Sequence, residues 1–149
     1  MYKRQVLGAI RVAFVTPLEP EDVFALSRGI DWILNYVRDL ISESEAMARP
    51  PDAGIAEMAA LLGKAVRHLE QAIGGLGPDG GDATEAADAA IRAERELERA
   101  YYNGMADLLE VKDMRERISR RELYRRLARI GEIVIDVAER VVYAVVKGS

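Results

Sequence analysis

The sequence predicts an all-α protein, an antiparallel helical bundle of about four long helices preceded by a short N-terminal one. Apolar residues recur at spacings of three and four in four long segments, which is the helical period. Stretches rich in Pro and Gly separate these segments, and no segment alternates apolar and polar residues as a strand would. The connections are short, which favours antiparallel neighbours. A chain of 149 residues, half of them hydrophobic, fits a single domain over residues 1–149.

The first two helices meet at the stretch FVTPLEPEDV, residues 14–23. A short helix near residues 6–14 should stop near Pro17, which has no N–H to donate. Pro20 suits the first position of the next helix, which we expect to run to about Ala48. The apolar stripe expected on this second helix consists of Val23, Leu26, Ile30, Ile33, Val37 and Ile41.

The second helix begins with several acidic residues. Glu19 falls at the N-cap, where Glu is a poorer cap than Ser, Thr, Asp or Asn. Glu21 and Asp22 follow in the first turn, where carboxylates face the positive end of the helix dipole. We therefore expect these acids to serve the start of the helix.

Three further helices complete the predicted bundle. Asp52 follows a Pro-Pro turn and can cap the third helix. The glycine-rich stretch 74–82 is the clearest loop. Asp82 and Ser119, each with a Glu three residues later, resemble capping boxes that begin the fourth and fifth helices. The expected core positions are Ile55, Met58, Leu62, Val66, Leu69 and Ile73 on the third helix and Leu123, Leu127, Ile130, Val134, Val137 and Val141 on the fifth.

Composition narrows the functional classes. The 25 acidic residues outnumber the 21 basic ones, so the net charge of −4 gives no general reason to expect a nucleic-acid partner. The absence of cysteine excludes thiolate metal sites and disulfides and fits a reducing compartment. No segment approaches the ~20 apolar residues that span a bilayer, and the N-terminal segment has no leader-peptide cleavage pattern. We expect a soluble, cytoplasmic protein.

Two glutamates interrupt the apolar pattern of the fourth helix. Glu94 falls near the middle of its apolar arc, and Glu98 falls near one edge. Because an isolated buried carboxylate is costly, Glu94 should be neutralised, paired or bound to a metal. Two interpretations stay open, namely an ion pair with an arginine such as Arg126 or Arg38, and a metal or ligand role.

A second acidic set, Glu132, Asp136 and Glu139, lies on the fifth helix opposite its core stripe. One interpretation is a solvated face, and the other is a pair of carboxylates that grips an oxygen-preferring cation. The di-iron signature of a Glu followed three residues later by His is missing, as are a phosphate loop, a Ser/His/Asp set and a zinc motif. We therefore expect no catalytic activity.

Two surfaces point to partners. Trp32 and Tyr36 project away from the core stripe of the second helix, which indicates either a helix packed on both sides or a subunit or partner interface. Residues 114–129 hold seven arginines, among them Arg120, Arg121 and Arg125, although positive charge at a helix N-terminus opposes the dipole.

Two explanations for the seven arginines stay open. Asp107, Glu110 and Asp113, at the end of the fourth helix, can pair with them. The alternative is contact with an anionic partner or with lipid headgroups.

Several segments, in order along the chain, resemble the PhoU-like phosphate-transport regulators, in particular the branch encoded beside low-affinity phosphate permeases. These segments are FVTP, PEDV, ALSRGIDWILNYV, IRAERELERAYY, LARIGEIVIDVAERV and AVVKGS. The resemblance implies two three-helix repeats, the first incomplete at its start and the second covering roughly residues 52–149. It also implies a non-catalytic protein that contacts a phosphate transporter or its sensor and meets the membrane only through that partner. The missing first helix should leave an apolar flank uncovered, so we expect a homo-oligomer, most simply a two-fold dimer. The alternative is a structural oligomerisation module.

The resemblance also bears on metal binding. Glu94 and Glu98 fall in the two acid positions of the family's acidic helix, and Glu132 and Asp136 remain on the last helix, which implies a divalent or iron site. Other acid positions of the family are replaced here, by Trp32, Asn35, Ala128 and Ile135. We therefore expect a divergent, metal-free relative.

Overall fold

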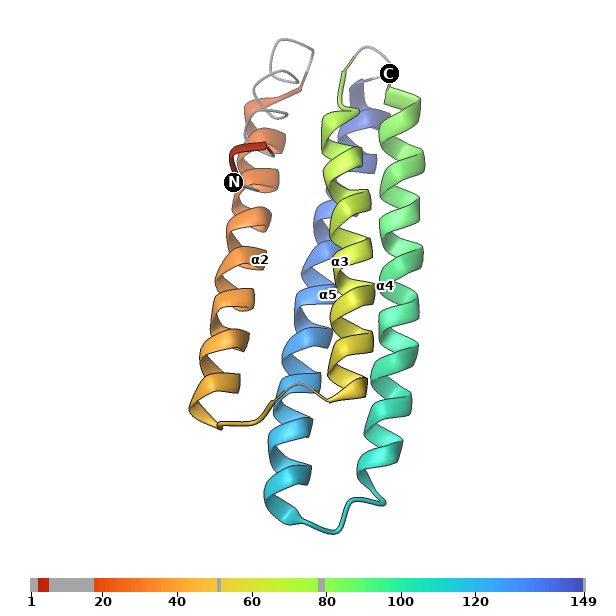
Figure 1. Ribbon diagram of the computed structural model, residues 1–149. Helices are drawn as coiled ribbons and strands as arrows, with labels where there is room; N and C mark the ends of the chain where they lie inside the picture. The colour runs from red at the N-terminus through yellow and green to blue at the C-terminus, as the bar shows by residue number, and fades with distance from the viewer. Residues whose placement is uncertain (1–2, 6–17, 51, 78–79, 149) are drawn as a thin grey trace.

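The computed structural model describes residues 3–5, 18–50, 52–77 and 80–148. Its four long helices are α2 (Pro20–Ala46), α3 (Ala53–Gly74), α4 (Gly80–Leu108) and α5 (Met114–Gly148). Successive helices run in opposite directions, and the described residues contain no strand (Figure 1). The predicted all-α bundle is confirmed. The short helix expected near residues 6–14 lies outside the described residues.

The four helices are not equivalent in their packing. Helices α3, α4 and α5 pack on one another in pairs, whereas the backbone of α2 packs closely on α5 alone among these four. Figure 1 accordingly shows α2 standing apart from α3 and α4 over most of its length. Helix α5 is therefore in close backbone contact with the other three long helices, and Leu26, Ile30 and Ile33 of α2 belong to the same hydrophobic core.

The core follows the predicted periodicity most closely on α5. All six expected positions of α5 are buried, as are five of the six on α3, where Val66 is partly buried. Helix α4 contributes mainly small side chains, and Ala83, Ala87 and Ala90 are completely buried. Small residues let helix backbones approach closely, and α4 packs closely on both α3 and α5. On α2 the prediction fails at Ile41, which is 53% exposed.

Local signals located some helix ends correctly. The Asp52 side chain accepts a hydrogen bond from the Ile55 N–H at 2.8 Å, which confirms the predicted cap of α3. Glu19 occupies the N-cap of α2 without a side-chain hydrogen bond, as expected for a poor cap. Helix α2 ends at Ala46, close to the expected Ala48.

The predicted starts of the last two helices are wrong. Helix α4 begins at Gly80, before Asp82. Helix α5 begins at Met114, where Asp113 accepts a hydrogen bond from the Arg115 N–H at 3.1 Å. Ser119 lies inside the helix, and its hydroxyl donates to the Glu116 carbonyl at 3.1 Å. An earlier acidic cap therefore replaces the expected one.

None of the described helices has an apolar stretch long enough to cross a lipid bilayer.

Candidate functional site

A groove runs along the contact between α2 and α5 and contains two adjoining hollows. The larger, of about 480 Å³, lies between α2, α4 and α5 and includes Tyr36 and Tyr101 in its wall. The other, of about 350 Å³, lies between α2 and α5 and includes Trp32. Tyr36 and Arg129 line both hollows, so the two are continuous. We refer to them together as the α2–α5 groove.

Close approach of the two helices positions the aromatic side chains of the groove. A Cβ atom at Gly29 would lie 2.4 Å from Cγ2 of Val137, so only glycine allows this approach. Trp32 and Tyr36 follow on α2 and stack with ring centroids 5.6 Å apart and an interplanar angle of 27°. Trp32 remains 45% exposed. This exposure favours an aromatic surface that is open to a partner over a helix packed on both sides.

Four arginines of α5 also line the groove: Arg125, Arg126, Arg129 and Arg140. Arg126 forms an ion pair with Glu43 of α2, and Nη1 of Arg129 lies 2.7 Å from Oε2 of Glu132. The hydrogen bond and the charge of Glu132 raise the pKa of Arg129 above its ordinary value. Arg125 is exposed and forms no ion pair within the described ranges. The groove therefore combines the exposed ring of Trp32 and the partly buried rings of Tyr36 and Tyr101 with Arg125, which has no ion pair among the described residues.

Glu94 lies in the contact between α4 and α5 and is only 3% exposed. Its predicted place in the middle of the apolar arc is confirmed. The expected ion pair is wrong, because Glu94 pairs with neither Arg126 nor Arg38 within the described part of the chain, and Arg126 is paired with Glu43. Burial first, and then the charge of Glu98, raise the pKa of Glu94 above its ordinary value. The neutral acid is thus the favoured form.

Gly131 of α5 makes room for the Glu94 side chain. A Cβ atom at Gly131 would lie 2.8 Å from Cδ2 of Leu97 and 3.0 Å from Oε1 of Glu94. The carboxyl group therefore rests against the backbone of the neighbouring helix. Sequence reasoning found the buried acid but not the glycine that accommodates it.

The four acids predicted as metal ligands do not form one cluster. Within the described ranges, no three His, Cys, Asp or Glu side chains are grouped so that they could hold a metal ion. Glu94 is buried and Glu98 is partly buried, whereas Glu132 and Asp136 are exposed on α5. Their exposure fits the solvated-face interpretation of the α5 acids. The metal site stays a prediction, and the described residues supply no complete ligand set for it.

Asp22, which sequence reasoning placed only in the first turn of α2, is completely buried. Nη2 of Arg140 lies 3.0 Å from its Oδ1, and Nζ of Lys147 lies 2.8 Å from its Oδ2. Lys147 also reaches Oε2 of Glu19 at 2.9 Å. The hydrogen bond to Asp22, followed by that to Glu19, raises the pKa of Lys147 above its ordinary value. This cluster joins the start of α2 to the end of α5.

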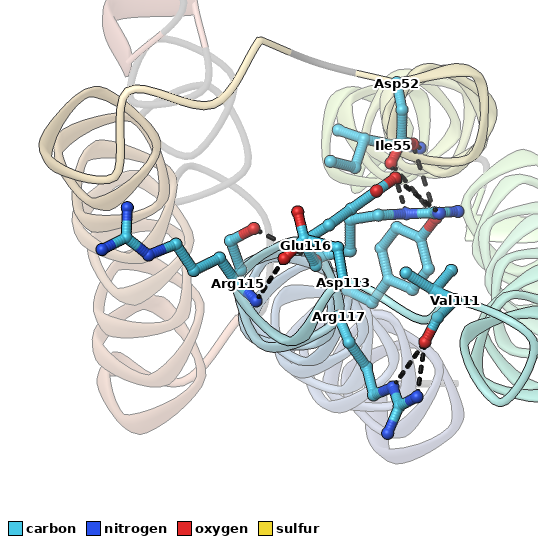
Figure 2. A network of polar contacts seen from close by, with 10 residues as sticks. Asp52, Ile55, Val111, Asp113, Arg115, Glu116 and Arg117 are labelled. Carbon is cyan, nitrogen blue, oxygen red and sulfur yellow. Dashed lines mark hydrogen bonds and ion pairs between the residues drawn. The ribbon is translucent and has the colours of Figure 1, made fainter.

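A second polar network joins the start of α3 to the first turns of α5 (Figure 2). Nε of Arg120 lies 2.8 Å from Oδ2 of Asp52, its Nη2 donates to the Tyr124 hydroxyl at 3.0 Å, and its Nη1 lies 3.4 Å from Oε1 of Glu116. Burial raises the pKa of the Tyr124 hydroxyl. These internal partners occupy the guanidinium of Arg120, so it is not free to bind a partner. Of the three arginines predicted for a partner surface, Arg121 and Arg125 remain exposed.

The acids at the end of α4 do not pair with the arginines of α5. No ion pair of Asp107, Glu110 or Asp113 is formed within the described ranges, where Asp113 caps the helix instead. Arg117 donates from Nε and Nη2 to the Val111 carbonyl, at 2.9 Å for Nε (Figure 2). The ion pairs that these arginines do form are with Glu116 and Glu132 of α5 itself, with Glu43 of α2 and with Asp52 at the start of α3.

Comparison with known protein families, with curated proteins and with solved structures finds no match.

Proposed function

We propose that this protein is a non-catalytic accessory protein that acts by binding a partner in the α2–α5 groove. The observation that carries the proposal is the stacked Trp32–Tyr36 pair, in which Trp32 is 45% exposed and the partly buried Tyr36 lines the same hollow as Arg125. Tryptophan, tyrosine and arginine are the residues that most often dominate the free energy of protein–protein binding. The groove thus offers the side chains of a binding site.

The polar groups of the groove support binding rather than covalent chemistry. Arg126 and Arg129 are each held by a carboxylate, so they shape the wall of the groove. Among the described residues that line the two hollows, only Tyr36 and Tyr101 carry a hydroxyl group, and the lining contains no serine or threonine. A tyrosine beside arginines suits hydrogen bonding to a docked peptide or helix.

The setting that we propose for this binding is cytoplasmic regulation of inorganic phosphate transport. It rests on the resemblance of the helix order and the acidic helix to the PhoU-like regulators. The partner would be a phosphate transporter or its sensor, contacted by protein–protein association.

The proposal is tested by affinity purification of the tagged full chain from detergent-solubilised membranes of its native host. We expect a phosphate transporter or sensor to be recovered, and Trp32→Ala to lower its recovery by about tenfold, as truncation of a central aromatic anchor does. Tyr102→Ala is the matched control, because Tyr102 is an aromatic residue of α4 that is 62% exposed and lines neither hollow.

Equal loss in both variants, or recovery that Trp32→Ala leaves unchanged, would contradict binding in the groove. Recovery of a second copy of this chain alone would favour the alternative of an oligomerisation module.

A further inference from the structure

The turn between α4 and α5, together with the start of α5, carries exposed apolar side chains at one end of the bundle. Leu109 is 78% exposed, Met114 is 67% exposed and Ile118 is 54% exposed. Figure 1 shows that this turn projects beyond the connection between α2 and α3. Single exposed apolar residues are common, but three of them within ten residues of a projecting turn form a patch. We refer to residues 109–125 as the basic tip.

The basic tip has the opposite charge to the rest of the chain. Residues 109–125 contain six Lys and Arg against four Asp and Glu, in a protein whose net charge is −4. Five of these cations are exposed and form no side-chain ion pair within the described ranges: Lys112, Arg115, Arg117, Arg121 and Arg125. Of these five, Arg117 donates to the Val111 carbonyl. In Figure 2 the side chain of Arg115 extends away from the neighbouring polar network. Positive charge is therefore available to a ligand at the tip.

The two kinds of side chain are ordered along one face of α5. Met114, Ile118, Arg121 and Arg125 are spaced by four, three and four residues, so they share a face. At 1.5 Å per residue, Ile118 lies roughly 6 Å and Arg121 roughly 10 Å along the axis from Met114. Interfacial helices bury their apolar face by about 5–10 Å at the boundary between headgroups and acyl chains. The distance between Met114 and Ile118 thus fits the depth to which such helices are buried. Arg121, the first arginine on this face, then follows at the level of the headgroups.

We propose that the basic tip inserts directly into the surface of an anionic lipid bilayer. Leu109, Met114 and Ile118 would enter the acyl boundary, while Arg121 and Arg125 would contact headgroup phosphates. At the projecting end, the exposed apolar side chains lie among exposed cations, so the tip matches an anionic bilayer surface in charge and in apolar content. This contact goes beyond the expectation that the protein reaches the membrane only through a partner. It shares Arg125 with the α2–α5 groove and otherwise uses different residues.

Three exposed acids oppose this contact and set its strength. Asp107, Glu110 and Asp113 lie at the same turn, where an anionic surface repels them. One short apolar turn and a few cations give reversible binding rather than permanent anchoring. Binding should therefore be weak, reversible and sensitive to salt.

The proposal is tested by co-sedimentation of the full chain with phosphatidylcholine vesicles that contain or lack phosphatidylglycerol. We expect binding to the anionic vesicles at low salt, weaker binding at physiological salt and none to phosphatidylcholine alone. Because these vesicles contain no protein, the result is independent of any transporter. Binding of both vesicle types alike, or of neither, would overturn the proposal.

Variants separate the two kinds of contact. Arg121→Gln with Arg125→Gln should lower the partition coefficient on anionic vesicles roughly 25-fold, at about fivefold for each cation. Arg67→Gln with Arg92→Gln removes two exposed arginines from α3 and α4 and should leave binding unchanged. Met114→Ser should lower binding by about tenfold, whereas Phe24→Ser, at a position that is 65% exposed on α2, should not. Equal losses in the variants and their controls would contradict a site at the tip.

Insertion itself can be observed with one fluorophore, because the chain has no cysteine of its own. An environment-sensitive dye attached after Met114→Cys should shift to the blue on anionic vesicles, and the same dye attached after Phe24→Cys should not. An unshifted dye at position 114 would rule out insertion. Strong binding of polyglutamate combined with no vesicle binding would overturn the proposal in favour of an acidic protein partner.

Discussion

Asp22 and Glu94 are both buried carboxylates, but they lie in different regions of the bundle and in different electrostatic surroundings. Asp22, where α2 begins, has Arg140 at 3.0 Å and Lys147 at 2.8 Å. Glu94, in the middle of α4, rests against Gly131 and forms no ion pair within the described ranges. One region stabilises a buried charge by pairing it, and the other favours the uncharged acid by burial. Burial alone therefore does not determine whether a carboxylate is charged in the folded protein or how it affects the stability of the fold.

The difference follows from where each helix lies in the fold. The backbone of α2 packs closely on α5 alone among the four long helices, so the cationic side chains of α5 can reach Asp22 while they remain partly exposed. Glu94 lies in the contact between α4 and α5, where burial and the charge of Glu98 both disfavour its ionised form. A charge at the edge can be paired from solvent-facing side chains, and a charge in the core cannot.

The largest effect should follow from removal of the buried charge of Asp22. Asp22→Asn leaves Arg140 and Lys147 without their acceptor and should lower the free energy of unfolding by about 3 kcal/mol, at the low end for a broken buried pair because both cations are partly exposed. Urea unfolding at neutral pH measures this. Asp31→Asn is the control, since the exposed Asp31–Lys3 pair should contribute less than about 1 kcal/mol. Equal effects of the two changes would remove the contrast between a buried pair and a surface pair.

A medium effect should follow from filling the close contacts that glycine permits in each region. Gly29→Ala and Gly131→Ala should each lower the free energy of unfolding by about 1–3 kcal/mol, because the added methyl group meets Val137 in one case and Leu97 in the other. Gly63→Ala is the control, since its Cβ would meet only the flexible end of Arg67. That change should raise stability by about 0.5–1 kcal/mol. Stabilisation by all three changes would show that the helices do not approach as closely as described.

The smallest effect should come from Glu94, and it should have the opposite sign to that of Asp22. The pKa of Glu94 is raised in the folded state, so its protonated form stabilises the fold below its ordinary pKa of 4.5, and this stabilisation is lost as the pH rises through the raised value. Glu94→Gln should therefore raise the free energy of unfolding at pH 8 by about 1 kcal/mol and flatten its decline with pH. Chemical unfolding across pH 4 to 8 measures this.

Glu139→Gln removes the same charge from an exposed site of α5 and should change little. A loss of stability in Glu94→Gln at every pH would restore the ion-pair interpretation, and a loss only in the presence of added metal would support the metal site.

The repeating core of the bundle could be predicted from the sequence because it depends on local spacing. The stripe of α5, from Leu123 to Val141, follows from the helical period alone. The cap at Asp52 follows from a local rule in the same way. The prediction that Ser119 caps α5 failed because a capping pattern can also occur inside a helix. Asp113, which comes earlier in the chain, caps the helix instead. Periodicity predicts which face is buried better than it predicts where a helix begins.

The pairing of the polar residues could not be predicted so well, because it depends on which helices are neighbours. The burial of Glu94 followed from its place in the arc, but Arg126 reaches Glu43 instead. Asp22 did carry a signal, since it precedes Leu26 and Ile30 by four and eight residues and so lies on the apolar stripe. The local role of an acid in the first turn of a helix concealed this second role.

The most direct test of this contrast is a carbon-detected NMR titration of the glutamate side-chain carboxyl groups, with Glu94 assigned by its loss in Glu94→Gln. The account predicts that the Glu94 carboxyl titrates with a midpoint above its ordinary value of 4.5. A Glu94 midpoint at or below 4.5 would mean that its charge is stabilised in the core. That result would contradict the account.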